Sequence, residues 1–282
     1  MPAFAVKTPK KTVETEMDIF IFGYVIIKSS DTIVKKEVNE MDAIQIRNLT
    51  KKYHDLIAVD DLNLDIKQGE LFSLLGLNGA GKTTTVKMLS CLTKPTQGEA
   101  WVGGYSVTCQ SDAVKRKIGV SPQETAVAPN LSVKENLELM CGIHGFSKEK
   151  TAKQTKMLSA QFGLQNIMNK KAGKLSGGYQ RRLSIAMALI GEPEILFLDE
   201  PTLGLDVIAR SELWDVIRAL KGKITVILTT HYMEEAEALS DSVGIMKDGK
   251  LLAVGTVRSL MEQTSAERFE NAFISIVKED ET

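Results

Sequence analysis

One short stretch, GLNGAGKTT at residues 76–84, constrains the fold of this 282-residue chain more than any other. It follows LFSLL, an apolar run without alternation that is typical of a strand buried on both faces. It precedes VKMLSCL, which has the spacing of a helix. Gly76, Gly81, Lys82 and Thr83 fit the pattern G-x-x-x-x-G-K-[ST]. The order strand, loop, helix therefore predicts an α/β protein with a phosphate-binding loop.

The residue types of this loop suit phosphate. Glycines allow consecutive backbone N–H groups to turn inward, the helix N-terminus adds partial positive charge, and Lys82 adds a full charge. The Thr83 hydroxyl is a ligand that suits Mg²⁺. The alternative, a merely flexible turn between strand and helix, does not require this spacing.

Two carboxylates end a second apolar run, ILFLDEP at residues 195–201. Burying Asp199 and Glu200 is costly unless a cation or a reacting group needs them. Because ligands bind at the carboxyl ends of parallel strands, we expect Asp199 to reach the Mg²⁺ held by Thr83. Glu200 is then left to polarise an attacking water. The alternative is an acidic helix cap before Pro201.

His231 and Gln123 are weaker candidates for the same site. His231 ends a third apolar run, ITVILTTH, so it should lie on the same edge of the sheet as Glu200 and touch the γ-phosphate or the water. A lone histidine at a strand end is, however, usually structural. Gln123 has a side chain able to meet Mg²⁺ or water, and only its position supports that role.

The rest of the chain suggests further parts. Residues 43–53 and 62–66 alternate like strands of an antiparallel edge sheet, whereas the buried runs predict a mostly parallel core with right-handed crossovers. Residues 124–174 predict an inserted α-helical subdomain, with a capping box at Ser132–Glu135 and a helical pattern at 148–161. Phe269, Ala272, Phe273 and Ile276 predict a short amphipathic helix in the tail, residues 256–282.

Composition excludes several classes of protein. The 43% hydrophobic content supports a packed core, and 35 basic against 36 acidic residues leave no excess charge for a nucleic-acid backbone. Cys91, Cys109 and Cys141 lack metal or disulfide spacing, which favours a reducing cytosol. The apolar stretch at residues 19–27 is too short to cross a bilayer and suits a short extra strand. Residues 1–40 form an extension of unknown role.

The ordered motifs together resemble the nucleotide-binding domain of ABC ATPases, over about residues 43–255. They are the loop at 76–84, Gln123, LSGGYQRRLSIA at 175–186, ILFLDEP, LGLD at 203–206, and His231. The resemblance implies a P-loop NTPase that binds ATP and Mg²⁺, with catalytic residues Glu200, His231 and Lys82 and metal ligands Thr83, Gln123 and Asp199. The implied nucleotide-binding residues are Tyr53, Gly76, Asn78, Gly79, Ala80, Gly81, Lys82, Thr83, Thr84, Gln123, Ser176, Gly177, Gly178 and Asp206.

The resemblance gives specific roles to Tyr53 and to the serine and glycines of LSGG, which by themselves look like a second anion-binding loop before a helix. Tyr53 stands where the family places an aromatic ring against adenine, although an exposed strand residue would look the same. Ser176, Gly177 and Gly178 correspond to the signature motif, which binds the γ-phosphate of an ATP held on a second subunit. The alternative for them is a glycine loop that starts a helix. The resemblance thus implies a head-to-tail dimer, most simply a homodimer.

Within that family, residues 121–145, residues 201–217 and the tail FENAFISIV resemble the drug and antibiotic exporters, the type-2 export systems. This implies a separate membrane-spanning partner, a peripheral place at the cytoplasmic face of the membrane, and no nucleic acid. Importers without an appended regulatory domain stay open. The second hypothesis is a soluble ABC ATPase of translation, DNA repair or cofactor assembly. Leu203 departs from the small or polar residue that the family often has there.

Overall fold

The computed structural model describes residues 20–21, 24–29, 32–37 and 42–279, with side chains for 42–279. The chain divides into two compact units, Met1–Met41 and Asp42–Thr282. In the first unit, β1 (Phe20–Ile21), β2 (Tyr24–Ser29) and β3 (Thr32–Glu37) form an antiparallel sheet in that order. The sequence predicts one short strand at 19–27, but the described residues of that stretch belong to two antiparallel strands, with Ile21 opposite Tyr24. Ile19, Phe22 and Gly23 lie outside the described residues. Among the described helices, none has the length and apolar character needed to span a bilayer.

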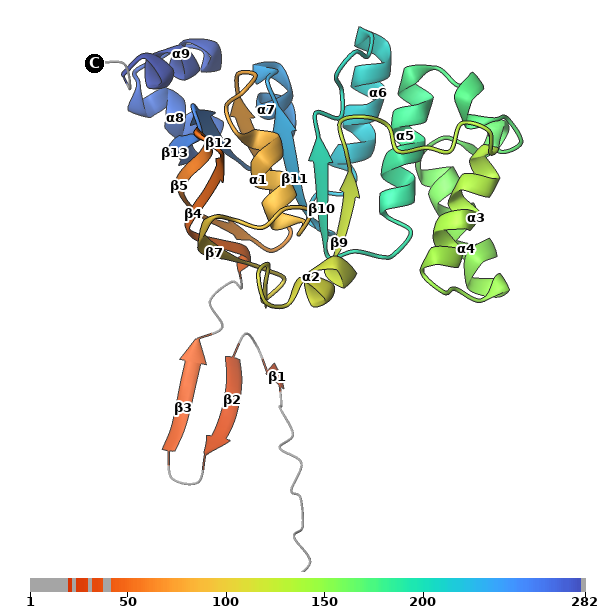
Figure 1. Cartoon of the computed structure of the whole chain (residues 1–282), viewed down its shortest axis with the longest axis horizontal. Coiled ribbons are helices and arrows are strands. Elements are labelled where there is room, and N and C mark those ends of the chain that lie inside the picture. The colour runs from red at the N-terminus through yellow and green to blue at the C-terminus, as the bar shows by residue number, and fades with distance from the viewer. Residues whose placement is uncertain (1–19, 22–23, 30–31, 38–41, 280–282) are drawn as a thin grey trace, which may run out of the picture. The chain divides into compact units, whose positions relative to one another are not determined.

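The second unit is built on a six-stranded sheet with the order β13-β12-β6-β11-β10-β9 (Figure 1). All neighbouring pairs are parallel except β12 with β13. The strands are β6 (Leu71–Gly76), β9 (Ile118–Ser121), β10 (Ile195–Asp199), β11 (Thr225–Thr230), β12 (Ser242–Lys247) and β13 (Lys250–Gly255). Every residue of β6, β10 and β11 is buried, which confirms the prediction of a parallel core from unbroken apolar runs.

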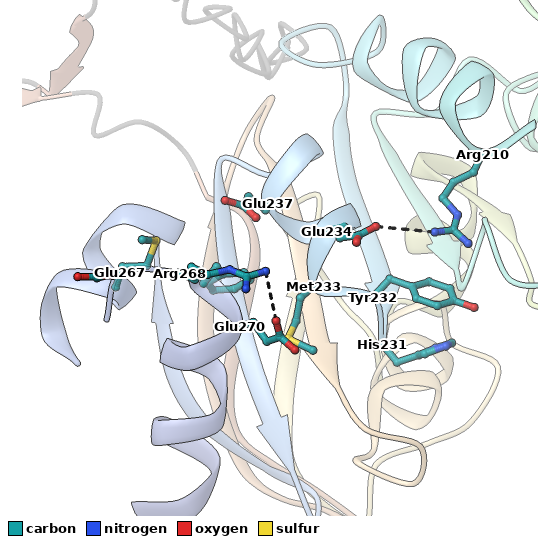
Figure 2. A pocket seen from close by; sticks show the side chains of 11 residues that line it. Arg210, His231, Tyr232, Met233, Glu234, Glu237, Glu267, Arg268 and Glu270 are labelled. Carbon is teal, nitrogen blue, oxygen red and sulfur yellow. Dashed lines mark ion pairs between the residues drawn. The ribbon is translucent and has the colours of Figure 1, made fainter. Parts of the chain in front are cut away.

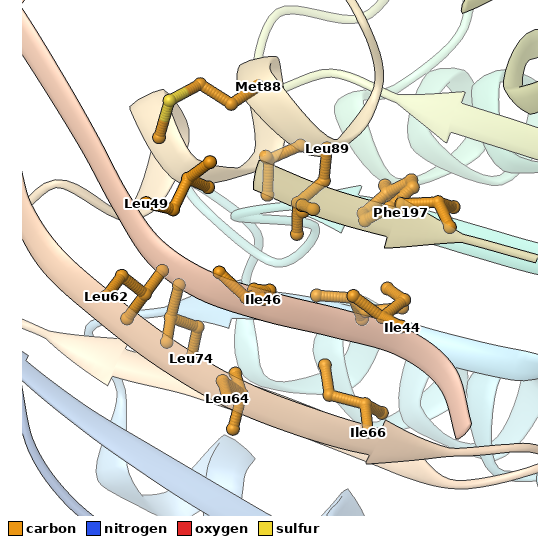
Figure 3. Close-up of a cluster of buried hydrophobic side chains, with 14 of the residues drawn as sticks. Ile44, Ile46, Leu49, Leu62, Leu64, Ile66, Leu74, Met88, Leu89 and Phe197 are labelled. Carbon is orange, nitrogen blue, oxygen red and sulfur yellow. The ribbon is translucent and has the colours of Figure 1, made fainter. Parts of the chain in front are cut away.

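A second sheet, ordered β5-β4-β7-β8, is antiparallel throughout. Its strands are β4 (Asp42–Tyr53), β5 (Leu56–Lys67), β7 (Gln97–Val102) and β8 (Tyr105–Ser106). The antiparallel prediction is confirmed, but these strands form a sheet of their own rather than an edge of the parallel one. Figure 3 shows the core between them: Ile44, Ile46 and Leu49 of β4 face Phe197 of β10 and Leu89 of α1 (Lys82–Leu89).

The helical segment occupies one side of the unit (Figure 1). The predicted capping box is confirmed: Ser132 and Glu135 exchange both bonds at the start of α3 (Val133–Ile143), and α4 spans Lys148–Gln161. Short turns η1 (Gln165–Ile167) and η2 (Ala172–Lys174) follow. Val133 and Leu137 pack in the same buried cluster as the strand residue Leu196, so this segment has no separate core among the described residues.

The remaining helices cover the parallel sheet. They are α2 (Ser111–Lys117), α5 (Gly177–Ala188), α6 (Val207–Arg218), α7 (Met233–Leu239), α8 (Val257–Gln263) and α9 (Phe269–Glu279). The apolar face expected in the tail is buried: Phe269, Ala272, Phe273 and Ile276 pack with Leu75 and Ala236 in a third cluster. The tail therefore docks on the sheet beside α7.

Strand register decides where the site forms. Asp199 of β10 pairs with Thr229 of β11, and Thr230 pairs with Leu75 of β6. Parallel neighbours end at the same edge, so the segments after β6, β9, β10 and β11 meet there. These segments carry the phosphate loop, Gln123, Glu200 and His231.

Candidate active site

The loop between β6 and α1 needs glycine at two positions. A Cβ on Gly76 would lie 2.4 Å from the carbonyl oxygen of Met246, which is too close for any side chain. Gly81 has φ +101°, and its Cβ would lie 2.5 Å from the carbonyl oxygen of Ala58. Helix α1 begins directly afterwards, so its free N–H groups point into the loop.

Lys82, Glu200 and His231 form one contiguous group of polar side chains. Lys82 Nζ donates to the carbonyl oxygens of Gly76 (2.7 Å) and Leu77 (3.1 Å). The same Nζ lies 3.4 Å from Glu200 Oε1, and both side chains are buried. Glu200 Oε2 lies 2.5 Å from His231 Nδ1. One carboxylate is thus held between an ammonium and an imidazole, which compensates its burial.

The backbone of Glu200 has a conformation that is uncommon for its residue type. Its φ is +48°, in the left-handed region that glycine, asparagine and aspartate favour. Its N–H donates to the carbonyl oxygen (3.1 Å) and the Oγ1 (3.0 Å) of Thr229, which stabilises the turn. Such outliers cluster at functional sites because the surrounding structure must maintain them.

Thr83 and Asp199 lie together beside this group. Thr83 Oγ1 donates to Asp199 Oδ1 at 3.1 Å, and Thr229 Oγ1 donates to the same oxygen at 2.5 Å. A hydroxyl and a carboxylate in contact at a phosphate loop are oxygen donors that fit Mg²⁺. Within residues 42–279, no group of three or more His, Cys, Asp or Glu side chains could hold a metal by itself.

A cavity of about 600 Å³ lies over the loop. It is lined by Tyr53, Asn78, Gly79, Ala80, Gly81, Lys82, Thr83, Thr84, Gln123 and Glu200, all expected at the site. Leu56, Ile57, Ala58 and Asp248 also line it, and the sequence analysis missed them. A usable signal existed for the first three, because they follow Tyr53 across a tight hairpin. Asp248 sits in the β12–β13 turn, and nothing in the sequence linked it to the loop.

The signature residues lie apart from this cavity: Ser176, Gly177, Gly178 and Asp206 do not line it. Ser176 precedes α5 as its N-cap, yet its side chain makes no capping bond, whereas Ser132, Ser147 and Thr256 all do. Ser176 is exposed, so its hydroxyl is available to a ligand. Asp206 instead caps α6, accepting a bond of 2.9 Å from the Ala209 N–H.

A second cavity, of about 450 Å³, borders His231 and reaches the tail (Figure 2). Tyr232 lies against His231, with ring centroids 4.0 Å apart, and the Arg210 guanidinium lies 4.8 Å from the centre of the Tyr232 ring. Arg210 also pairs with Glu234 at 4.0 Å. The sequence analysis did not single out these neighbours of the histidine.

Glu235, three residues beyond Tyr232, is a buried carboxyl behind the site. Trp214 Nε1 donates to its Oε1 at 3.0 Å. Burial raises the pKa of Glu235 above its usual value. The folded protein therefore binds this proton more tightly than the unfolded chain. The resulting stabilisation is complete below the unfolded pKa of about 4.3 and is lost as pH rises through the folded pKa.

Replacement of Glu235 by glutamine should remove this pH-dependent loss while keeping an acceptor for Trp214. As pH rises from about 5 to about 8, the free energy of unfolding of the variant should increase relative to that of wild type by on the order of 1 kcal/mol. This corresponds to about 2–4 °C in Tm. Thermal melts at both pH values test this, with the exposed neighbour Glu234→Gln as control. A Tm difference that does not change with pH would contradict the argument.

Comparison with known proteins identifies the family of this chain. The ABC transporter family matches residues 59–203. The chain is 40% identical over 229 residues to the daunorubicin resistance ATP-binding protein DrrA3 of Streptomyces coeruleorubidus. The aligned region covers 81% of this chain and 72% of that protein. It is 39% identical to the phospholipid-transporting ATPase ABCA3 of Homo sapiens over 79% of this chain and 13% of that protein. It is 39% identical to the probable multidrug ABC transporter ATP-binding protein YbhF of Escherichia coli, over 83% of this chain and 41% of that protein.

Two solved structures share the fold. One, described as the ATP-binding subunit of an ABC transporter, has a TM-score of 0.75 and 26% identity, covering 83% of this chain and 99% of that one. The other is a dimer of the ATP-binding cassette MJ0796 in a post-hydrolysis state with ADP and Pi. It has a TM-score of 0.68 and 30% identity, and the match covers 76% of this chain and 98% of that one. The chain belongs to the ABC transporter family and carries its ATP-binding domain, a P-loop NTPase fold.

Proposed function

We propose that this chain is the ATP-hydrolysing subunit that powers export of a substrate through a separate membrane-spanning partner. The observation that carries the proposal is the placement of Glu200 between Lys82 and His231 at the edge of the loop cavity. The names of relatives, which include drug-resistance and multidrug ATP-binding proteins, support the export direction. Because the chain spans only 13% and 41% of two of its relatives, activity and partner remain part of this proposal.

The polar residues in and beside the cavity have separate roles in hydrolysis. The loop N–H groups and Lys82 bind the phosphates, and Lys82 exchanges its carbonyl partners for phosphate oxygens. Glu200 accepts hydrogen bonds from the attacking water, and His231 orients that carboxylate. Thr83, Asp199 and Gln123 would hold Mg²⁺, which would supply positive charge against the phosphates. Tyr53, half-exposed at the cavity wall, stacks on the adenine.

The signature residues complete the site of a second copy. Ser176, Gly177 and Gly178 lie outside this chain's own cavity, and the unused Ser176 hydroxyl and the N-terminus of α5 are suited to an anion. An isologous pair places each loop opposite the other chain's signature, with Asp206 near the contact. ATP then favours the closed dimer, and loss of the γ-phosphate releases it. A dimer of one relative, with ADP and Pi, is consistent with this arrangement.

The other parts of the chain follow from this proposal. Residues 43–255 form the ATPase domain, residues 124–174 the helical part that meets the membrane partner, and residues 256–282 a tail. The chain acts at the cytoplasmic face of the membrane, as a homodimer. The charge balance, 35 basic against 36 acidic residues, supports a protein rather than a nucleic-acid partner.

Purified protein should hydrolyse ATP in the presence of Mg²⁺. Lys82→Ala should lower the rate about a hundredfold or more, because the positive charge that stabilises the transferred phosphate is lost. Lys87→Ala, an exposed lysine of the same helix, is the matched control and should retain activity. Phosphate release at saturating ATP measures both.

Co-expression with a candidate membrane-spanning transporter subunit tests the transport part. Membrane recruitment and faster hydrolysis on its addition are expected, and Lys82→Ala should still be recruited. Sedimentation with ribosomes or DNA instead of membranes would favour the soluble alternative and contradict the transporter proposal.

A further inference from the structure

Arg181 is a buried arginine inside the signature helix α5. Its Nη1 donates to the carbonyl oxygen of Pro122 at 2.6 Å, and its Nη2 donates to the carbonyl oxygen of Gln123. The side chain is 5% exposed, whereas the adjacent Arg182 reaches the surface and pairs with Glu212. The two arginines of this motif therefore face different environments.

The contacts of Arg181 continue a tight seam between α5 and β9. Ser184, one turn further along, lies with its Oγ 3.0 Å from the Oγ of Ser121 at the end of β9. At the base of the strand, a Cβ on Gly119 would lie 2.3 Å from the carbonyl oxygen of Ala188, so helix and strand touch there. Arg181 extends this seam past the strand, onto the segment that carries Gln123.

Packing alone does not explain a charged residue here. Arg181 forms no ion pair within residues 42–279, and burial lowers its pKa, opposed by the charges of Asp199 and Glu235. An apolar side chain of similar length would fill the space without the desolvation penalty of a cation. What only an arginine offers is a planar fork that holds two consecutive carbonyl groups at once.

We propose that Arg181 is a positioning residue that holds the Pro122–Gln123 backbone so that the Gln123 side chain faces the phosphate loop. Gln123 lines the loop cavity with Lys82 and Thr83. The residue is exposed, so the position of its side chain depends on its backbone, whose carbonyl oxygen Arg181 holds. Arg181 lies five residues, about 7.5 Å of helix, from Ser176, so it also links the signature loop to the metal side of the same chain's site. The inference rests on the proposed role of Gln123 as a metal ligand.

Three variants separate this role from simple packing. Arg181→Met keeps a long apolar side chain and loses both bonds, whereas Arg181→Lys keeps the charge and can bind one carbonyl. Arg182→Met removes the neighbouring arginine, which contacts Glu212 rather than Gln123, and is the matched control. Thermal melts show which variants are folded.

The readout is the binding of a non-hydrolysable ATP analogue, measured by calorimetry with and without Mg²⁺. Without Mg²⁺, all variants should bind it within about threefold of wild type, because the loop is untouched. The affinity for Mg²⁺ in the presence of the analogue should fall about tenfold in Arg181→Met, less in Arg181→Lys, and not in Arg182→Met. A lower Tm of Arg181→Met with unchanged Mg²⁺ affinity would overturn the inference. If Arg181→Met fails to fold, unchanged Mg²⁺ affinity in folded Arg181→Lys overturns it equally.

Gln123→Ala distinguishes this inference from the function on which it rests. It should weaken Mg²⁺ binding, and adding Arg181→Met to it should cause little further loss, because both changes remove one interaction. If Gln123→Ala leaves Mg²⁺ binding unchanged, the proposed metal role of Gln123 fails. If Gln123→Ala weakens it and Arg181→Met does not, only the positioning role of Arg181 is overturned.

Discussion

Glu200→Gln is expected to lower ATP hydrolysis about a thousandfold while ATP binding and ATP-driven dimerisation persist. In the proposed mechanism this carboxylate polarises the attacking water, and general-base catalysis contributes about 10²–10⁴-fold to a rate. The amide retains an oxygen that can face Lys82 Nζ, now 3.4 Å from Glu200 Oε1, and the unusual backbone at φ +48° accepts either residue equally. The loop that binds the phosphates is unchanged.

Single-turnover phosphate release and light scattering with ATP measure the two halves of this expectation. Glu192→Gln is a matched control, because Glu192 is also a non-glycine residue at positive φ (+54°) but pairs with Lys150 on the surface. It should hydrolyse ATP normally. A Glu200→Gln variant that turned over at the normal rate would remove the assigned base, and one that stayed monomeric with ATP would contradict the composite site.

Ser176→Arg should lower the rate of ATP hydrolysis about a thousandfold and leave ATP binding unchanged. The Ser176 side chain makes no capping bond, so its replacement removes no such bond, and the residue lies outside the cavity proposed to bind this chain's ATP. A large cation in its place would occupy the position where the partner's γ-phosphate must approach N–H groups of α5, removing preorganised donors from the transition state.

Ser147→Arg is the control, an exposed N-cap serine whose side chain does accept a bond from the Lys150 N–H. It should cost about 1 kcal/mol of stability and leave hydrolysis intact. Nucleotide binding and steady-state phosphate release separate the two variants. Normal hydrolysis by Ser176→Arg would contradict any role of this loop in catalysis.

A mixture of the two inactive variants sharpens both expectations. In a mixed dimer, Glu200 of the Ser176→Arg chain faces the intact signature of the Glu200→Gln chain, so one complete site is restored. Equal mixing should then recover about a quarter of the wild-type rate, because about half of the dimers are mixed and each has one of two sites. If each chain used its own signature, mixing would recover nothing.

Local chemistry made much of this site predictable. The phosphate loop is a continuous segment whose glycines, lysine and threonine act together, and unbroken apolar runs identified β6, β10 and β11. Because parallel strands end at one edge of a sheet, the meeting of Asp199, Glu200 and His231 with the loop could be predicted from their positions at the ends of buried strands. The helical segment was also placed well, since Ser132 and Glu135 are a local capping signal.

Other features depended on contacts between distant segments. Periodicity could not tell which of Arg181 and Arg182 is buried, because adjacent helical residues differ in environment only after α5 is set against β9. Asp248 lies at the cavity because the β12–β13 turn folds over the loop: the Gly249 N–H donates to the Ala80 carbonyl oxygen at 3.1 Å.

By itself, the sequence determined the chemical capacity of the residues: which of them can bind phosphate, which can accept a proton from water, and which begin a helix whose N-terminus can bind an anion. Tertiary structure decided how these groups are divided: Lys82 and His231 each contact Glu200, and Ser176 lies outside the loop cavity. The reason is physical. Residue type sets charge and hydrogen-bonding capacity locally, whereas distance and burial are set by the packing of helices and strands far apart in the chain.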